Sequence, residues 1–263
     1  MSFLLIPKGS LGDHVCYTGL PKVLKFHFNT DIIVQTKYPK LFDSNPYVSR
    51  VILPNESRPK DVTGSFEIPY ETQEWQWLVY RPVRAFYQLT GRIIDRKEVQ
   101  PKIYFPLETR LGYITIADQA GWRTRRGYPY LGNLSKKLLD IGYHVTIIHD
   151  PNYTDYNGNY SEREINHYNV SVKEDYSTLI KIIAESQYFI GYDSGMAHIA
   201  QALEVPSIVF AGSVPPITFI HNAAIKVYDT CEKHCNKENC EYNCLSHYKN
   251  VTDEIVDIIE KGI

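Results

Sequence analysis

Short apolar runs alternate with amphipathic stretches along the first half of the chain, and this alternation predicts strands connected by helices. The runs SFLLIP, DIIVQT, SRVILP and FEIPY have the length and apolar content of buried strands. Between the first two, VCYTGLPKVLKFHFN has apolar residues at helical spacing. A second helix is expected from about Glu74 to Leu89, kinked or divided at Pro82. Strands and helices in this order favour a parallel sheet with crossover helices.

The same alternation resumes after VQPKIYFPLETRLG, a segment with two prolines and no helical period that we interpret as a linker. The runs YITIA, HVTIIH, YNVSV, YFIGY, SIVFAG and AIKVY are predicted strands, with helices between most of them. The closing helix, TDEIVDIIEKG, has Thr252 as its expected N-cap. The sequence therefore predicts two doubly wound α/β halves, residues 1–106 and 107–263, with a cleft at the carboxyl ends of their strands.

Composition narrows the class of protein. The chain has 263 residues, of which 43% are hydrophobic and 22% charged, as in a globular protein. Its apolar runs are much shorter than the roughly 20 residues that cross a bilayer, and its N-terminus lacks the layout of a signal peptide. We therefore expect no membrane span and a cytoplasmic location.

Charge is distributed unevenly. The formal net charge is −2, yet ten Lys or Arg and only four acidic residues lie between Arg81 and Arg126. Such a stretch either contacts an anionic partner or forms a solvated helix face.

The segment GYDSGMAHIAQALEVPSIVFAG, residues 191–212, predicts a strand, a turn, a helix and a further strand. Asp193, Ser194, Gly195 and His198 gather at the start of the helix. A helix N-terminus presents unpaired N–H groups and a positive dipole end, which suits a phosphate or diphosphate. Ser or Asp at this position is by itself most often only a cap.

Three segments together resemble glycosyltransferase family 9, the heptosyltransferase-like glycosyltransferases. Residues 176–216 are similar to its donor-site segment, residues 8–52 to its opening Gly-x-x-Gly-Asp loop, and residues 123–148 to its basic loop. In the last, Tyr128-Pro129 stands where the family has Trp-Pro, and residues 55–105 remain unmatched. The donor-segment matches are Asp193, Ser194, Gly195, His198, Ala200, Ala202, Leu203, Pro206 and Gly212.

The resemblance implies an α/β protein of GT-B fold, with two Rossmann-like domains, a cleft between them and a reduced N-terminal domain. Residues 1–106 would bind the acceptor. Residues 107–263 would bind a nucleoside-diphosphate-sugar and carry a Cys-rich loop and a closing helix. The implied activity is an inverting, metal-independent transfer of a sugar to an acceptor hydroxyl. The implied acceptor is a saccharide, either neutral or anionic.

Site residues follow from the same resemblance. Asp13 matches the catalytic Asp of the Gly-Asp loop and would take the acceptor's proton, with Lys8, Gly12 and His14 on the acceptor side. The departing diphosphate would be neutralised by helix N–H groups and basic side chains. The implied donor-binding residues are Arg123, Arg125, Arg126, Asp193, Ser194, Gly195, Met196, Ala197, His198 and Gly212.

Two other functions stay open at this point. The first is sugar transfer to hydroxymethylated bases of phage or viral DNA, in which the basic stretch would contact phosphates. The second is a nucleotide-binding module without turnover, although the presence of Asp13 argues against it.

Four cysteines form the pattern C-x3-C-x4-C-x3-C, at Cys231, Cys235, Cys240 and Cys244. This spacing fits a structural zinc site, one or two disulfides, or free thiols, with His234 and His247 as further candidate ligands. A comparable cluster occurs in many members of the family that the chain resembles. Cys16 is expected to be a small core residue.

Overall fold

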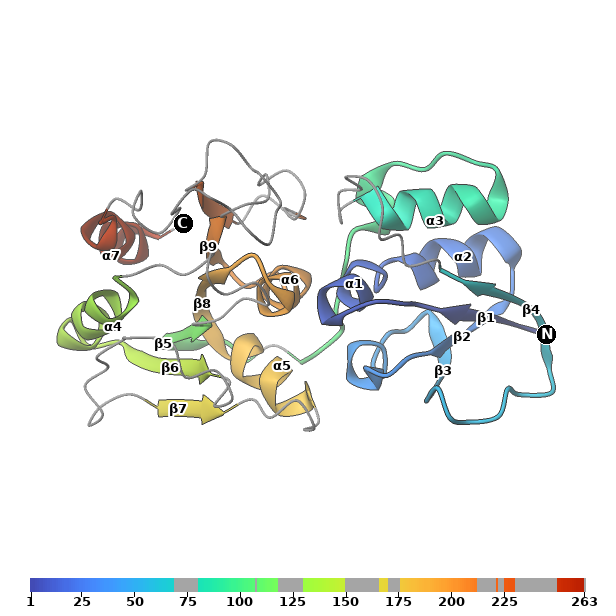
Figure 1. The fold of residues 1–263 in the computed structure, drawn as a ribbon, viewed down its shortest axis with the longest axis horizontal. Helices are drawn as coiled ribbons and strands as arrows, with labels where there is room; N and C mark the ends of the chain where they lie inside the picture. Colours follow the sequence, from blue (N-terminus) through green and yellow to red (C-terminus); the bar gives the residue numbers. More distant parts are fainter. Residues whose placement is uncertain are drawn as a thin grey trace, which may run out of the picture. The chain divides into compact units, whose positions relative to one another are not determined.

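The computed structural model describes residues 1–68, 80–106, 108–117, 130–149, 166–169, 176–211, 221, 225–229 and 250–262. The chain divides into two compact units (Figure 1). The N-terminal unit comprises Met1–Pro106 and Ile217–Asn222, and the C-terminal unit comprises Leu107–Pro216 and Ala223–Ile263. Each contains one parallel β-sheet with helices packed on it.

The sheet of the N-terminal unit has four strands in the order β3-β2-β1-β4, all parallel. Apolar residues that alternate along the strands, among them Leu4, Ile6 and Ile33, share one face and form a buried cluster. The strands are β1 (Ser2–Ile6), β2 (Asp31–Gln35), β3 (Val48–Ile52) and β4 (Val62–Glu67). The helices are α1 (Leu11–Cys16), α2 (Leu20–Phe28) and α3 (Arg81–Thr90), with 3-10 turns η1 (Pro39–Leu41) and η3 (Arg96–Val99).

The helix expected from VCYTGLPKVLKFHFN is two helices, α1 and α2, separated by a turn at residues 17–19. Pro21 lies in the first turn of α2, where its missing N–H breaks no helical hydrogen bond. Gly19 precedes α2, and a Cβ there would lie 2.3 Å from the carbonyl oxygen of Gln100. The close approach of residues 99–100 therefore requires a glycine at this break.

Helix α3 has no kink at Pro82 within its described residues. It begins at Arg81, so that Pro82 occupies its first turn, a position that favours proline. Residues 69–79, which include the expected start at Glu74, lie outside the described residues.

The C-terminal unit has six parallel strands in the order β10-β9-β8-β5-β6-β7. Helices α4 and α7 cover one face of this sheet, and α5 and α6 cover the other (Figure 1). The strands are β5 (Arg110–Ala117), β6 (His144–His149), β7 (Asn166–Asn169), β8 (Ser186–Tyr192), β9 (Ser207–Ala211) and β10 (Ile225–Asp229). The helices are α4 (Leu131–Asp140), α5 (Tyr176–Ala184), α6 (Gly195–Ala202) and α7 (Thr252–Lys261).

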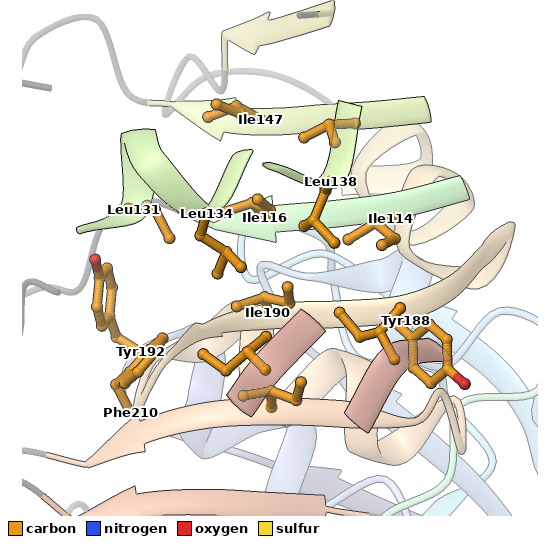
Figure 2. Close-up of a cluster of buried hydrophobic side chains, with 14 residues drawn as sticks. Ile114, Ile116, Leu131, Leu134, Leu138, Ile147, Tyr188, Ile190, Tyr192 and Phe210 are labelled. Atoms are coloured by element: carbon orange, nitrogen blue, oxygen red, sulfur yellow. The ribbon is translucent and has the colours of Figure 1, made fainter. Parts of the chain in front are cut away.

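A large buried hydrophobic cluster of this unit lies between the sheet and the helices α4 and α7 (Figure 2). Ile114 and Ile116, two residues apart on β5, point to the same face and meet Leu134 of α4. Thr252 is the first helical residue of α7 and not its N-cap; its N–H is instead bound by Asn250 Oδ1 at 3.1 Å. The helix thus starts one residue earlier than expected.

Strand order locates the functional end of each sheet. When the six strands of the C-terminal unit are renumbered 1 to 6 along the chain, their order across the sheet is 3-2-1-4-5-6. Strands 1 and 4 of this numbering are β5 and β8, and the direction in which strands are added to the sheet reverses between them. In the N-terminal unit it reverses between β1 and β4. Ligands of open α/β sheets bind at the carboxyl ends of strands beside such a reversal. The segments that follow β1 and β8 are therefore the places to look for a site.

None of the helices within the described residues has the length and apolar character needed to cross a lipid bilayer.

Candidate functional site

The loop after β1 places Asp13 in the first turn of α1, where its carboxylate is buried. Ser10 is the N-cap of the helix. Its N–H donates to Asp13 Oδ2 at 2.7 Å, and its hydroxyl donates to the same oxygen at 2.8 Å. Asp13 thus satisfies a free N–H of the helix start while its own charge is favoured by the helix dipole.

The other carboxylate oxygen, Oδ1, is paired with Nη1 of Arg81, the first residue of α3. Only 6% of the Asp13 side chain and 18% of the Arg81 side chain are exposed. A pair with this little exposure is screened much less by water and salt than a surface salt bridge. Each oxygen of the carboxylate therefore has its own partner, Ser10 at Oδ2 and Arg81 at Oδ1.

Gly9 allows the loop to pass this close to the carboxylate. Its φ is +106°, a conformation that favours glycine, and a Cβ at this position would lie 2.4 Å from Asp13 Oδ2. Any side chain at position 9 would displace the carboxylate or the loop.

His14 and Tyr38 lie beside Asp13 and are uncharged at neutral pH. Burial lowers the pKa of the His14 imidazole from 6.5 to about 4. Its Nδ1 lies 3.1 Å from the Ser10 carbonyl oxygen, so the neutral ring carries its proton on Nδ1. Burial, and then the charge of Asp13, raise the pKa of the Tyr38 hydroxyl above its usual value of 10. The two rings meet edge to face, with centroids 4.8 Å apart.

Two further residues of this loop were predicted to act on the acceptor side, Lys8 and Gly12. Gly12 is buried within α1. Lys8 is exposed, and its Nζ lies 3.1 Å from Oε1 of Glu67 on β4. Lys8 is thus directed along the sheet edge toward β4, which neighbours β1.

The segment after β8 forms the second candidate site, because Asp193 and Ser194 connect this strand directly to α6. Ser194 is the N-cap of α6, in extended conformation. The next N–H groups, on Gly195, Met196 and Ala197, belong to the first turn, where an α-helix has no carbonyl partners for them. The turn therefore presents a row of donors with the positive end of the helix dipole behind them.

The side chains at this turn are buried and polar. Asp193 Oδ1 lies 3.9 Å from Nε2 of His198, and both residues are almost fully buried. The Ser194 hydroxyl is also buried, yet it has no hydrogen-bond partner within the described part of the chain. A buried hydroxyl without a partner costs free energy, so it points to a ligand or water that binds there.

The structure thus groups the predicted residues into two sets, one at each reversal of strand order. The first is Lys8, Gly12, Asp13 and His14; the second is Asp193 to His198. Several predicted residues lie outside the described residues, namely Arg123, Arg125, Arg126, Gly212, Cys231, Cys235, Cys240 and Cys244.

Sequence reasoning missed four residues around Asp13, namely Gly9, Ser10, Tyr38 and Arg81. Gly9 and Ser10 belong to the KGSLGDH motif, so the sequence showed that they are close to Asp13 along the chain. Arg81 was noted only as the first residue of the basic stretch, because a contact across 68 residues of chain has no local sequence signal.

Comparison with known proteins bears on the fold and on the segment that contains the second set. Residues 70–247 match the family model of glycosyltransferase family 9 (heptosyltransferase). A search of curated proteins finds no match. The family match covers the segment after β8 and all four cysteines of the C-x3-C-x4-C-x3-C pattern.

Solved structures with a similar fold are glycosyltransferases. The iron-containing dodecameric glycosyltransferase TibC from enterotoxigenic E. coli H10407 has a TM-score of 0.74 at 15% identity, over 99% of this chain and 76% of that one. A family 9 glycosyltransferase from Veillonella parvula has a TM-score of 0.72 at 15% identity, over 99% and 96%. The E. coli ADP-heptose lipopolysaccharide heptosyltransferase II has a TM-score of 0.65 at 15% identity, over 99% of each chain.

These likenesses confirm the predicted fold class, α/β of GT-B type with two Rossmann-like units. The match to the family model covers more than half of the sequence, in agreement with the resemblance that its motifs indicated. The chain belongs to glycosyltransferase family 9, the heptosyltransferase family, and is a glycosyltransferase.

Proposed function

We propose that the protein is an inverting glycosyltransferase that moves a sugar from a nucleoside-diphosphate-sugar to an acceptor hydroxyl, with Asp13 as general base. The observation that carries the proposal is the state of the Asp13 carboxylate. It is buried at the carboxyl end of β1, held by two donors from Ser10 and paired with Arg81. A carboxylate that is fixed in position at this end of the sheet is placed to act as a general base.

The reaction is a single displacement at the anomeric carbon. The acceptor oxygen forms a bond to that carbon as the bond to the diphosphate oxygen breaks. The nucleoside diphosphate leaves with the electron pair, and the hydroxyl proton passes to Asp13. Attack from the face opposite the leaving group inverts the anomeric configuration.

The leaving diphosphate is proposed to bind at the start of α6. The N–H groups of Gly195, Met196 and Ala197 and the hydroxyl of Ser194 supply donors, and the helix dipole favours the negative charge. His198 lies one turn further on, beside Asp193. The resemblance adds Arg123, Arg125, Arg126 and Gly212 to this donor site.

A nucleotide-sugar is the donor that this arrangement favours. TibC has been solved with ADP-D-β-D-heptose, and the E. coli heptosyltransferase WaaC with an ADP-linked fluoroheptose. We propose the same class of donor here, bound by the C-terminal unit, and a saccharide acceptor bound by the N-terminal unit near Lys8, Gly12 and His14. No step of this mechanism requires a metal ion or a cofactor.

A screen of nucleotide-sugars tests the proposal. Purified protein is mixed with ADP-, UDP- and GDP-linked hexoses and heptoses, and both the unfolding temperature and the release of nucleoside diphosphate are measured. We expect one donor to stabilise the wild type and the Asp13→Asn variant alike, and only the wild type to release its diphosphate. The exposed Asp43, paired with Lys40, provides a control through Asp43→Asn. Equal turnover by Asp13→Asn would exclude Asp13 as the base.

A further inference from the structure

The surroundings of Asp13 distinguish its two oxygens. We propose that Ser10 and Arg81 are positioning residues that give these oxygens different tasks: Oδ2 anchors the carboxylate, and Oδ1, beside Arg81, accepts the proton. This inference rests on the proposed function, in which Asp13 is the base.

Oδ2 has little capacity left to accept a proton. A carboxylate oxygen has about two lone-pair sites. At Oδ2 these meet the N–H and the hydroxyl of Ser10, at 2.7 and 2.8 Å. Gly9 closes the same side, since a Cβ there would lie 2.4 Å from Oδ2. Two short hydrogen bonds and a tight loop therefore fix this oxygen.

Oδ1 has a different environment. It is paired with Arg81 Nη1, which leaves one of its lone-pair sites for the hydroxyl of an acceptor. Arg81 is carried by the first turn of α3, whose Ala85 and Phe86 are buried and hold the helix in place. The guanidinium is thus presented to Oδ1 from a helix that is anchored by buried side chains.

The other charged or titratable groups near Asp13 do not replace this ion pair. His14, on α1, and Tyr38, before η1, are both uncharged at neutral pH. Lys8 and Lys37 act on His14 through space, and Lys8 is paired with Glu67. Among the residues that the structure describes, Arg81 is the cation that forms an ion pair with the carboxylate.

The arrangement has two opposing effects on catalysis. An opposite charge in contact with a carboxylate favours the ionised form of that carboxylate. The same cation makes the carboxylate a weaker base once the acceptor is bound. Replacing Arg81 by a neutral residue should therefore move the acid limb of the pH–activity profile to higher pH, because the base is then protonated more readily.

The test uses hydrolysis of nucleotide-sugars, in which water is the acceptor. The water oxygen bonds to the anomeric carbon, the diphosphate leaves with the electron pair of the broken bond, and one water proton passes to Oδ1. Profiles of kcat/KM against pH are measured for ADP-, UDP- and GDP-linked sugars with wild type, Arg81→Met and Arg81→Lys. Arg92→Met is the control, because it removes the same charge from an exposed residue beyond the far end of α3.

We expect the acid limb of Arg81→Met to lie about 1–2 pH units above that of wild type, as for loss of a close opposite charge. Arg81→Lys should restore most of the shift, and Arg92→Met should leave the limb in place. The pH profiles are then measured again with His14→Gln added to the wild type and to each variant. This removes the contribution of His14, which gains charge near pH 4, to the acid limb.

If Arg81→Met fails to fold, Ser10→Ala provides a second measurement. It keeps the backbone donor and removes the hydroxyl donor to Oδ2, so we expect a fall in kcat of about tenfold and a smaller shift of the limb in the same direction. If Arg81→Met folds and its acid limb coincides with that of the wild type, the inference is overturned. If Arg81→Met does not fold, the same result with a folded Ser10→Ala overturns it. A wild type that turns over none of the donors overturns the proposed function and this inference with it.

Discussion

At the scale of single residues, the position of the Asp13 carboxylate, the proposed base, depends on a glycine. Gly9 has φ +106°, and its missing side chain leaves space for Asp13 Oδ2. The sequence motif KGSLGDH showed that a tight loop precedes the aspartate. It did not show which glycine the carboxylate requires, because that depends on the rotamer of Asp13.

Gly9→Ala should therefore lower the rate of catalysis far more than the stability of the fold. The strained φ should cost about 1–3 kcal/mol of stability, while displacement of the carboxylate by about 1 Å should lower kcat roughly 100-fold. Gly142→Ala is the matched control, since Gly142 has φ +94° but nothing within 4 Å of its added Cβ. Urea unfolding and donor hydrolysis would be measured for both. Equal effects of the two variants on kcat would contradict the role of Gly9.

His14 makes the stability of the fold depend on pH. Its folded-state pKa of about 4 lies below the ordinary value of 6.5, so between these values the unfolded chain binds a proton that the folded chain does not. The contribution of His14 to the free energy of unfolding is therefore fully present above pH 6.5. It is lost as the pH falls to about 4, and the total loss is about 3 kcal/mol.

His14→Asn should flatten this dependence, because an amide can still donate to the Ser10 carbonyl but does not titrate. The free energy of unfolding would be measured in urea from pH 4 to 7. His144→Asn, which removes an exposed imidazole, is the control. A wild-type slope that persists in His14→Asn would show that another group is responsible.

At the scale of elements, the start of α6 combines a helix N-terminus with a buried hydroxyl that has no partner in the described part of the chain. The sequence located this turn correctly after a strand and before a helix. It could not show whether Ser194 merely caps the helix, because a cap and a ligand donor have the same sequence pattern. The structure adds that the hydroxyl makes no cap hydrogen bond to its own helix.

Ser194→Ala should leave the free protein as stable as the wild type, or slightly more stable. An N-cap serine that bonds its helix would cost about 1 kcal/mol on removal, but this hydroxyl makes no such bond. The affinity for a nucleotide-sugar should fall about tenfold, since a donor to a charged oxygen is lost. Calorimetry and thermal unfolding would measure the two quantities.

The control is Ser207→Ala, which breaks a buried bond from Oγ to the Val205 carbonyl at 2.7 Å. It should lower stability by about 1 kcal/mol and leave donor affinity unchanged. If Ser194→Ala destabilises the free protein as much as Ser207→Ala does, the hydroxyl is a structural cap.

Element boundaries were harder to predict than element types. Periodicity alone predicted one helix where α1 and α2 stand, because the break at Gly19 depends on residues 99–100 approaching from elsewhere in the chain. The strand expected at YNVSV begins two residues earlier, at Asn166, where β7 pairs with β6.

At the scale of the whole molecule, two parallel sheets each have their own core. The alternation of apolar runs and amphipathic segments predicted both sheets, since buried parallel strands have a strong local signal. Strand order has no such signal, and it was this order that located the two sets of polar residues at β1 and β8.

Substitutions in the two separate cores should have additive effects on the free energy of unfolding. Leu4 belongs to the cluster of the N-terminal unit and Ile190 to that of the C-terminal unit. Leu4→Ala and Ile190→Ala should each lower the free energy of unfolding by about 2–5 kcal/mol, and the double variant by the sum within about 0.5 kcal/mol. Urea unfolding of the three variants tests this. A larger departure from the sum would show that the cores are coupled.

The most direct test of inverting transfer with Asp13 as base is the anomeric configuration of the first-formed sugar. Proton NMR would follow the hydrolysis of the nucleotide-sugar that the wild type turns over fastest, within the time before mutarotation. We expect the anomer opposite to that of the donor, formed by the wild type and at least 100-fold more slowly by Asp13→Asn. A sugar released with the donor's own configuration, or formed as fast by Asp13→Asn, would contradict it.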